Sequence, residues 1–332
     1  MKLPTRRHTA PAGSLLYDAP GPRTRMITYL VSAVSTIAIA AGVYFLIYLP
    51  LQEKDQFTLA KWGPLVDPEN KNFDALWKRI GEGMQNTLTA AALAIVFSLL
   101  IGTTLAVVRV QLQQLRRRNY TNVSPGLAWT LRRLTWLLNA VTRFCVEVFR
   151  GLPVVITIFF VARGLPEFGL DFDNLWFIVI GLTIYNGVVI GEILRSGMTG
   201  LPGGQAEAAN SIGLSPMQTT RLVLLPQAYR IMLPALISQV VVVLKDTSLG
   251  FLIGYDDVLQ VAKQAINLLK NPIQLYFVVG AIFIVVNYVL SKLAQYLQRR
   301  LAQGRRTPAA AAVLADTTTA GVAGSGIGGI VG

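Results

Sequence analysis

Apolar runs about as long as a membrane is thick limit the fold of this chain more than any other feature of its sequence. Hydrophobic residues make up 53% of its 332 residues and charged residues only 14%. An α-helix needs about 20 predominantly apolar residues to cross a hydrocarbon core. Such runs lie at residues 27–49, 84–108, 144–162, 175–196, 231–254 and 273–297. The predicted fold class is therefore an all-α polytopic membrane protein with about six transmembrane helices.

The third run differs from the others because it contains Glu147, Arg150 and Pro153. Proline removes a backbone N–H and bends or ends a helix. We therefore expect either a span or a membrane-surface helix that bends at Gly151-Leu152-Pro153 into a shorter span.

Basic residues predict the orientation, because loops rich in Lys and Arg stay in the cytoplasm. The leader before residue 27 is basic. The loop after the second run has no acidic residue and contains Arg109, Arg116, Arg117, Arg118, Arg132 and Arg133. The segment after the last run adds Arg299, Arg300, Arg305 and Arg306. Six helices with both termini cytoplasmic satisfy this pattern, and they also place residues 197–230 in the cytoplasm.

The predicted organisation follows from these runs and loops. It comprises a basic leader (1–26), a first transmembrane helix (27–49), an extracytoplasmic loop (50–83), a five-helix core (84–300) and a cytoplasmic tail (301–332). The first apolar run exceeds the roughly 7–15 residues of a signal-peptide core, so we interpret it as an uncleaved helix. The tail is low in complexity and rich in small residues, which predicts disorder.

Composition also excludes several classes of function. The single Cys145 and the single His8 make a metal site or a histidine-centred catalytic site improbable, and no cofactor is expected. The formal charge is +13, but the basic residues flank apolar runs instead of forming one folded face, which argues against nucleic-acid binding. Glycines 324, 326 and 329 match G-x-G-x-x-G without a preceding strand or a following helix, so they predict no nucleotide site.

A polar, alanine-rich segment at residues 203–226 lies within the predicted cytoplasmic loop 198–230. Residues 205–212 favour a helix, and Gly213 is placed to end it in a left-handed conformation. Ser215 and Gln218 form the S-x-x-Q pattern of a capping box, and Pro216 suits a first helical position. Pro226 is expected to interrupt the second helix. The sequence thus predicts a compact helical hairpin that a cytosolic protein could contact.

The motif Glu207-Ala208-Ala209, three residues, Gly213, nine residues and then Val223-Leu224-Leu225-Pro226 resembles the EAA loop of ABC-importer permeases. The family pattern has Ile where Val223 stands, a volume-conserving change. In that family the loop docks in a cleft of the ATP-binding subunit. The resemblance implies that Glu207, Ala208, Ala209, Gly213 and Pro226 couple this chain to a separate ATPase. The remaining alternative is a surface hairpin that merely joins two spans.

Four further stretches are similar to polar amino acid uptake permeases, especially the glutamate type. They are residues 85–88 (QNTL), 147–153 (EVFRGLP), 192–197 (EILRSG) and 244–249 (LKDTSL), and the resemblance covers about residues 80–300. The chain departs from the family at Leu152, where Thr is frequent, and at Asp246, where Asn is frequent. Asp246 therefore carries a negative charge that the family's frequent Asn lacks.

Charged residues inside a bilayer cost free energy and need a reason. We interpret Lys245, Asp246, Thr247, Ser248, Asn86 and Arg150 as a candidate substrate pathway, with Lys245 offsetting the charge of an acidic substrate. A structural ion pair or hydrogen bond is an equal alternative for Lys245 and its neighbours.

Other polar and small residues in the spans are expected to be structural. Glu147 and Arg150 are predicted to pair, and Glu192 and Arg195 to form a structural or gating pair. The neutral residues predicted to hydrogen-bond between helices are Asn86, Asn186, Gln239 and Asn287. Gly187-x-x-x-Gly191 and Gly250-x-x-x-Gly254 favour close helix packing.

The resulting prediction is the permease subunit of an ATP-driven importer of polar amino acids in a bacterial cytoplasmic membrane. No Walker A motif occurs, so the resemblance to the EAA loop implies that ATP is bound by another chain. The resemblance implies an ABC ATP-binding subunit, a second permease subunit and an extracytoplasmic solute-binding protein as partners, with glutamate as the first candidate substrate. The alternatives are an ion-gradient-driven secondary transporter or channel, and, less favoured, a membrane enzyme.

Overall fold

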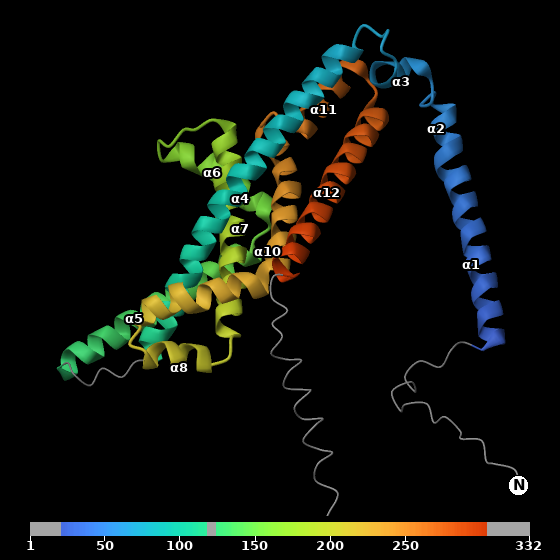
Figure 1. The fold of residues 1–332 in the computed structure, drawn as a ribbon. Coiled ribbons are helices and arrows are strands. Elements are labelled where there is room, and N and C mark those ends of the chain that lie inside the picture. The colour runs from blue at the N-terminus through green and yellow to red at the C-terminus, as the bar shows by residue number, and fades with distance from the viewer. Residues whose placement is uncertain (1–20, 118–123, 304–332) are drawn as a thin grey trace, which may run out of the picture. The chain divides into compact units, whose positions relative to one another are not determined.

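The computed structural model describes residues 21–117 and 124–303, and all regular secondary structure in those ranges is helical. The chain divides into two compact units between Asn70 and Lys71. The predictions for residues 1–20, for Arg118 and for the tail after residue 303 fall outside the described residues. Figure 1 shows the helices of both units.

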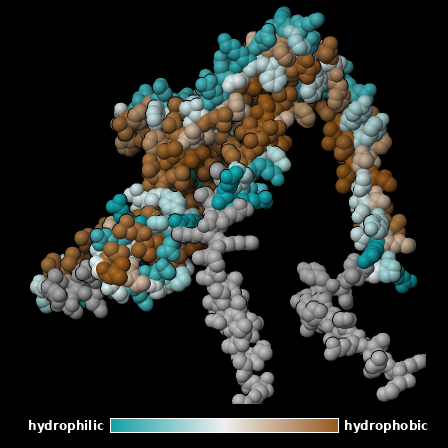
Figure 2. Space-filling model, in the orientation of Figure 1, coloured by the Kyte–Doolittle hydropathy of each residue, from teal (hydrophilic) through white to brown (hydrophobic). Residues whose placement is uncertain are grey.

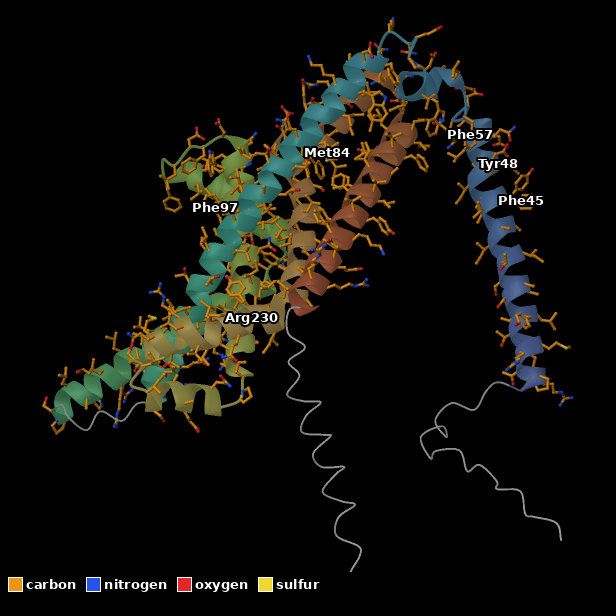
Figure 3. The ribbon with its side chains drawn as sticks, viewed as in Figure 1. Phe45, Tyr48, Phe57, Met84, Phe97 and Arg230 are labelled. Atoms are coloured by element: carbon orange, nitrogen blue, oxygen red, sulfur yellow. The ribbon has the colours of Figure 1, made fainter. Side chains whose placement is uncertain are left out.

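The first unit contains a long apolar helix followed by two short ones. They are α1 (Pro22–Val43), a π-helical turn η2 (Tyr44–Tyr48), α2 (Leu49–Glu53) and α3 (Leu59–Val66). Residues 22–53 run on without a break and are apolar enough to cross a membrane, which confirms the first predicted span. Tyr48 stacks on Phe57 with 5.5 Å between the ring centroids, as Figure 3 shows for the labelled side chains. Residues 50–83, predicted as a loop, are largely helical.

The second unit holds the remaining helices. These are α4 (Phe73–Arg117), α5 (Pro125–Gly151), α6 (Val154–Glu167), α7 (Asn174–Thr199), α8 (Gly204–Ser211), α9 (Pro216–Gln218), η3 (Thr219–Leu224), α10 (Leu225–Asp246), η4 (Thr247–Ile253), α11 (Val258–Leu269) and α12 (Pro272–Gln303). Among the described residues five helices are long and apolar enough to cross a membrane, and a bent pair brings the number to six. The predicted second, fourth and sixth spans lie within α4, α7 and α12, and the fifth covers most of α10, all of η4 and the Gly254 that follows. In Figure 2 apolar side chains cover the middle of this unit.

The third predicted span is the bent pair. The helix α5 ends at Gly151, α6 begins at Val154, and the two make an angle of 106°. Leu152 between them has extended backbone (φ −82°, ψ 137°), which the following Pro153 favours for steric reasons. The bend predicted at Gly151-Leu152-Pro153 is confirmed. The preceding helix, however, starts well before the predicted residue 144.

The helix α7 forms the centre of this unit and packs against α4, α6 and α10. It approaches α4 closely where neither helix carries a side chain. A Cβ atom on Gly102 would lie 2.8 Å from the Gly187 carbonyl oxygen and 2.7 Å from Ile190 Cγ2, and one on Gly191 would lie 3.1 Å from the Gly102 carbonyl oxygen. The predicted packing role of Gly187 and Gly191 is confirmed.

The second glycine pair has another role. Gly254 has φ +78° and ends η4, and a Cβ atom on Gly250 would meet Tyr255 five residues later in the same segment. The prediction of close helix packing at Gly250 and Gly254 is therefore wrong. A left-handed turn needs glycine for its backbone angles, not for room between helices.

Two of the predicted interhelical hydrogen bonds form one link. Gln239 Nε2 of α10 donates to Asn186 Oδ1 of α7 at 2.7 Å, and Asn186 is fully buried. Asn86 Nδ2 instead donates to the Asp256 carbonyl oxygen, and Asn287 Nδ2 to Phe283 of its own helix. A buried amide pair of this kind holds α7 and α10 in one register.

We expect Gly102→Ala to weaken the core, because the added methyl group would press on backbone as well as on a side chain. Overpacking of this kind costs about 1–3 kcal/mol. Gly81→Ala is the matched control on the same helix, since a Cβ atom there meets nothing within 4 Å. Thermal unfolding in detergent would show a lower melting temperature for Gly102→Ala and an equal or higher one for Gly81→Ala. Equal melting temperatures for the two variants would contradict the close approach.

Candidate functional site

The polar segment between α7 and α10 folds into the predicted hairpin. Its first helix, α8, ends with Gly213 at φ +84°. Gly213 N–H donates to the Asn210 carbonyl oxygen at 3.0 Å, and Leu214 N–H to that of Ala209 at 3.2 Å. These two bonds form a Schellman motif, in which the left-handed position favours glycine. The predicted helix end at Gly213 is confirmed.

The second half of the hairpin begins at the predicted capping box. Ser215 N–H donates to Gln218 Oε1 at 2.8 Å, and Gln218 N–H donates to Ser215 Oγ at 3.4 Å. Pro226, however, does not interrupt the helix, because the π-helical segment η3 lies directly before it and α10 continues past it. Helical backbone tolerates proline where the hydrogen-bond register has already changed.

The hairpin presents one acidic residue among small and apolar ones. Glu207 and Ala208 are exposed, as are Ile212 (78%) and Leu222 (65%). Ala209 is 4% exposed and lies toward the inside of the hairpin, where α8 packs on η3. The structure thus separates the motif residues. Glu207 and Ala208 are available to another protein, whereas Ala209 holds the two halves of the hairpin together.

Side chains of the long helix α4 fasten the hairpin to the core. Gln111 Nε2 donates to the Pro216 carbonyl oxygen at 3.1 Å and to Thr220 Oγ1 at 2.7 Å. The Tyr229 hydroxyl at the start of α10 makes a short hydrogen bond with the Thr103 hydroxyl of α4. These bonds connect the hairpin to α4, and continuous backbone connects it to α10.

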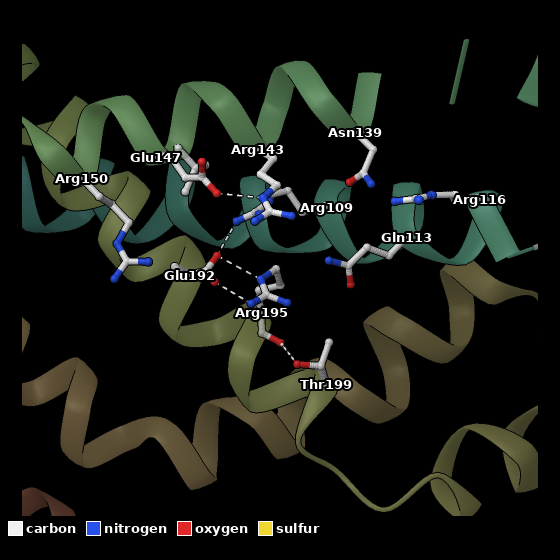
Figure 4. A pocket seen from close by; sticks show the side chains of 11 residues that line it. Arg109, Gln113, Arg116, Asn139, Arg143, Glu147, Arg150, Glu192, Arg195 and Thr199 are labelled. Atoms are coloured by element: carbon white, nitrogen blue, oxygen red, sulfur yellow. Dashed lines mark hydrogen bonds and ion pairs between the residues drawn. The ribbon is translucent and has the colours of Figure 1, made fainter. Parts of the chain in front are cut away.

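A polar cavity of about 770 Å³ lies next to the hairpin end of the core, between α4, α5 and α7. Its charged lining residues are Arg109, Arg116, Arg143, Arg150, Arg195, Glu147 and Glu192. Five arginines and two glutamates give the lining a formal charge of +3. Figure 4 shows these side chains converging from three helices. A surplus of positive charge of this kind favours the binding of an anion.

Glu192 is the centre of an ion triad in this cavity. Its carboxylate accepts hydrogen bonds from Arg195 at 2.5 Å and 2.9 Å, and it also pairs with Arg109 of α4. The Arg109 side chain is only 8% exposed, and its Nε is buried without an acceptor among the described residues. The predicted Glu192–Arg195 pair is confirmed. The triad extends it to a link between α4 and α7.

The other predicted pair is wrong. Glu147 accepts a hydrogen bond from Arg143 Nε at 2.7 Å, four residues before it, and not from Arg150. Arg150 is exposed and has no ion pair among the described residues. On α5 both i+3 and i−4 neighbours are within reach of Glu147, so spacing alone could not choose between them.

Of the predicted pathway residues, only Arg150 lines this cavity, which we call the arginine cavity. The other five candidates lie outside it. Lys245 is exposed at the end of α10, and Asp246 beside it is half-buried. Neither side chain makes a hydrogen bond or an ion pair within the residues that the structure describes. The Thr247 hydroxyl donates to Leu244 at 2.6 Å and the Ser248 hydroxyl donates to Lys245 at 2.8 Å, so both hydrogens are used within the helix end.

Asn86 lies at the junction between α4 and the segment that precedes α11. Its carbonyl oxygen accepts a hydrogen bond from the Tyr255 hydroxyl at 2.9 Å. Asp257 in the same segment caps α11 by accepting from Gln260 N–H at 2.7 Å, and burial raises the pKa of Asp257 to about 7. The contacts of Asn86 are structural, and they tie this end of α4 to α11.

Sequence reasoning missed two residues of α4 that contact the cavity wall and the hairpin. Arg109 was counted only as a loop charge that sets orientation, and Gln111 was not singled out. Arg109 follows directly after the apolar run 84–108, which was an available signal. The partners of both residues lie more than 80 positions away along the chain, so no local pattern could have identified them.

Comparison with known proteins places these features in a family. The family model of the binding-protein-dependent transport system inner membrane component matches residues 123–303. The chain is 36% identical over 259 residues to the glutamate transport system permease protein GluD of Corynebacterium glutamicum, which covers 77% of this chain and 85% of that protein. It is also 36% identical over 168 residues to the probable glutamine ABC transporter permease protein GlnP of Bacillus subtilis, which covers 49% and 77%.

A solved structure agrees with the sequence relatives. The crystal structure of an amino acid ABC transporter with histidines superposes with a TM-score of 0.55 at 25% identity, covering 69% of this chain and 96% of that one. Its likeness supports the all-α polytopic fold. The family model and the sequence relatives describe transport permeases. The chain belongs to the binding-protein-dependent inner membrane permeases, as the permease subunit of an amino acid ABC importer in a bacterial cytoplasmic membrane.

Proposed function

We propose that this subunit imports polar amino acids, with glutamate as the first candidate and glutamine or aspartate as others, by ATP-driven alternating access. The arginine cavity is the observation that carries the choice of an acidic substrate. A glutamate molecule has two carboxylates and one ammonium group. Arg116, Arg143 and Arg150 can receive the carboxylates, and Glu147 offers an acceptor for the ammonium group. The names of the glutamate and glutamine relatives support the same substrate class.

The coupling to ATP hydrolysis is proposed to pass through the hairpin. Glu207 is exposed and has no ion pair among the described residues, so its carboxylate is available to a cationic group of a separate ATP-binding subunit. The exposed Ile212 and Leu222 would supply apolar contact area. Arginine-rich loops on the hairpin side are consistent with a cytoplasmic position of this end.

Movement of the hairpin then reaches the cavity through α4. Gln111 bonds to the hairpin, and Arg109, two residues before it, pairs with Glu192 in the cavity wall. A second permease subunit, either a copy or a paralogue, would complete the pathway, and an extracytoplasmic solute-binding protein would deliver the amino acid. That protein can drive the cycle only if it prefers one permease conformation.

We expect Glu207→Ala and Gly213→Asp to abolish ATP-driven uptake without preventing membrane insertion. The first removes the exposed carboxylate. The second places a side chain at φ +84°, which costs about 1–2 kcal/mol. Gly204→Ala is the matched control, since a Cβ atom there meets nothing and the residue is helical. Uptake of labelled glutamate into vesicles carrying the complete transporter is the measurement. Normal uptake by both variants would refute the coupling role.

We expect Arg150→Gln to reduce glutamate uptake about tenfold or more, because it removes a charge-assisted hydrogen bond worth about 1.5–3 kcal/mol. Lys245→Met tests the alternative substrate contact at the end of α10. Arg230→Gln is the control, since this exposed arginine of α10 does not line the cavity (Figure 3). The measurement is how strongly unlabelled glutamate competes with uptake of labelled glutamate. A loss of competition shows weaker binding, whereas a lower amount of assembled transporter reduces uptake without changing the competition. Unaltered competition in Lys245→Met would make Lys245 structural, and the same result for Arg150→Gln would remove the cavity from the substrate path.

We expect Glu192→Gln to lower the melting temperature of the purified subunit, because Arg109 would remain buried beside a second arginine without a counter-charge. The expected cost is about 2 kcal/mol, below the 3–5 kcal/mol of a fully buried pair, since the Glu192 side chain is 18% exposed. Glu147→Gln removes the same charge from an exposed pair and should change the melting temperature little. Equal effects of the two substitutions would contradict a structural triad.

A further inference from the structure

One side of the helix α5 is apolar and uncovered. Its residues recur at spacings of three, four and seven, which places them on one side of the helix. They are between 40% and 67% exposed, namely Leu127, Leu134, Leu137, Val141, Phe144 and Val148. The opposite side of α5 contributes Asn139, Arg143 and Glu147 to the arginine cavity. An apolar face of this extent on a packed helix calls for a covering partner.

The level of α5 along the core is fixed by the cavity. Asn139 and Arg143 of α5 share that cavity with Arg109 and Arg116 of α4. Arg109 directly follows the apolar run of α4, which ends at residue 108. The helix α5 therefore lies where the apolar part of α4 gives way to arginines. In a bilayer this level is the headgroup layer, on the same side as the hairpin (Figure 1).

The angle between α5 and α6 indicates that α5 lies along the membrane surface. It makes an angle of 106° with α6, so the two helices cannot both run along the membrane normal. An amphipathic helix that lies along the membrane surface buries its apolar side in the acyl chains and keeps its charged side toward water. The division of α5 into an apolar outer side and a polar cavity side fits that arrangement.

Aromatic and basic side chains complete the pattern. Trp129 and Trp136 are 60% and 53% exposed, and the Arg133 guanidinium lies over the Trp129 ring at 5.4 Å. Arg132 is exposed next to Arg133, and no acidic residue occurs from position 124 to 146. Tryptophan favours the interface between acyl chains and headgroups, and adjacent arginines there attract anionic lipids.

We propose that α5 is an in-plane membrane helix whose apolar side enters the leaflet on the hairpin side and whose Arg132 and Arg133 bind anionic phospholipid headgroups. A second copy of the chain fits this side less well. Parallel pairing of two α5 helices would bring the arginines of both copies together, and the single acidic residue of α5, Glu147, lies on the cavity side instead of on this side. Because the other side of α5 lines the arginine cavity, lipid bound here positions one wall of that cavity.

The chain carries a natural probe for this proposal. Cys145 is its single cysteine and is exposed. It lies four positions after Val141 and three before Val148, which places it on the apolar side of α5. A spin label on Cys145 of the full chain, reconstituted in vesicles of phosphatidylcholine and phosphatidylglycerol, should be accessible to oxygen and shielded from a water-soluble nickel chelate. The control label, on Cys145→Ser/Asn139→Cys, should show the reverse order. Access of the chelate to Cys145 would overturn the proposal. Shielding from both reagents, with spin coupling between two labels, would also overturn it in favour of a second permease copy.

The lipid preference is tested separately. Arg132→Gln/Arg133→Gln should weaken the retention of phosphatidylglycerol by the purified chain about 30-fold, the effect of two interfacial arginines. The matched control is Arg299→Gln/Arg300→Gln, an exposed adjacent pair on α12 in which Arg300 also lies over an aromatic ring. Equal losses in the two double variants would show a general attraction of basic residues to the membrane and would overturn the specific role of α5.

Discussion

The close approach of α4 and α7 is the constraint on which the other features of the core depend. Gly102 meets Gly187 and Gly191 without intervening side chains, so the two helices have one register. Two turns further along α4, this register places Arg109 against Glu192, the residue after Gly191. The ion triad is thus a consequence of backbone contact. The helix α7 also bonds to α10 through Asn186 and Gln239. The positions of the cavity walls and of the helix that follows the hairpin therefore both depend on how α7 packs.

Local chemistry made the hairpin predictable from sequence. Gly213, Ser215 and Gln218 act on neighbours within a few positions, so their residue types alone specify a helix end and a capping box. The inward position of Ala209 was not predictable, because it depends on how α8 packs on η3. The π-helical segment before Pro226 was missed for a related reason: a change of hydrogen-bond register has no clear residue signature, and the expected interruption was wrong.

Tertiary structure decided the features that sequence reasoning did not reach. The apolar runs predicted most spans, since burial in a bilayer needs only length and composition. The cavity requires three helices to converge, and its key residue Arg109 has its partner 83 positions away. Glu147 had candidate partners on both sides along α5, and only its surroundings could select Arg143. The pathway candidates likewise separated, with Arg150 in the cavity and Lys245 at the end of α10.

The surplus of positive charge in the cavity explains why its walls need support from elsewhere. Arginines from three helices repel one another, and Glu192 is already shared by two of them, which leaves Arg116 and Arg150 without a counter-charge among the described residues. Such an arrangement is costly when empty and becomes favourable when an anion enters. The glycine contact and the triad hold two walls, α4 and α7, against this repulsion. The third wall, α5, lacks comparable packing, so a membrane contact along its outer side supplies the restraint that the core does not.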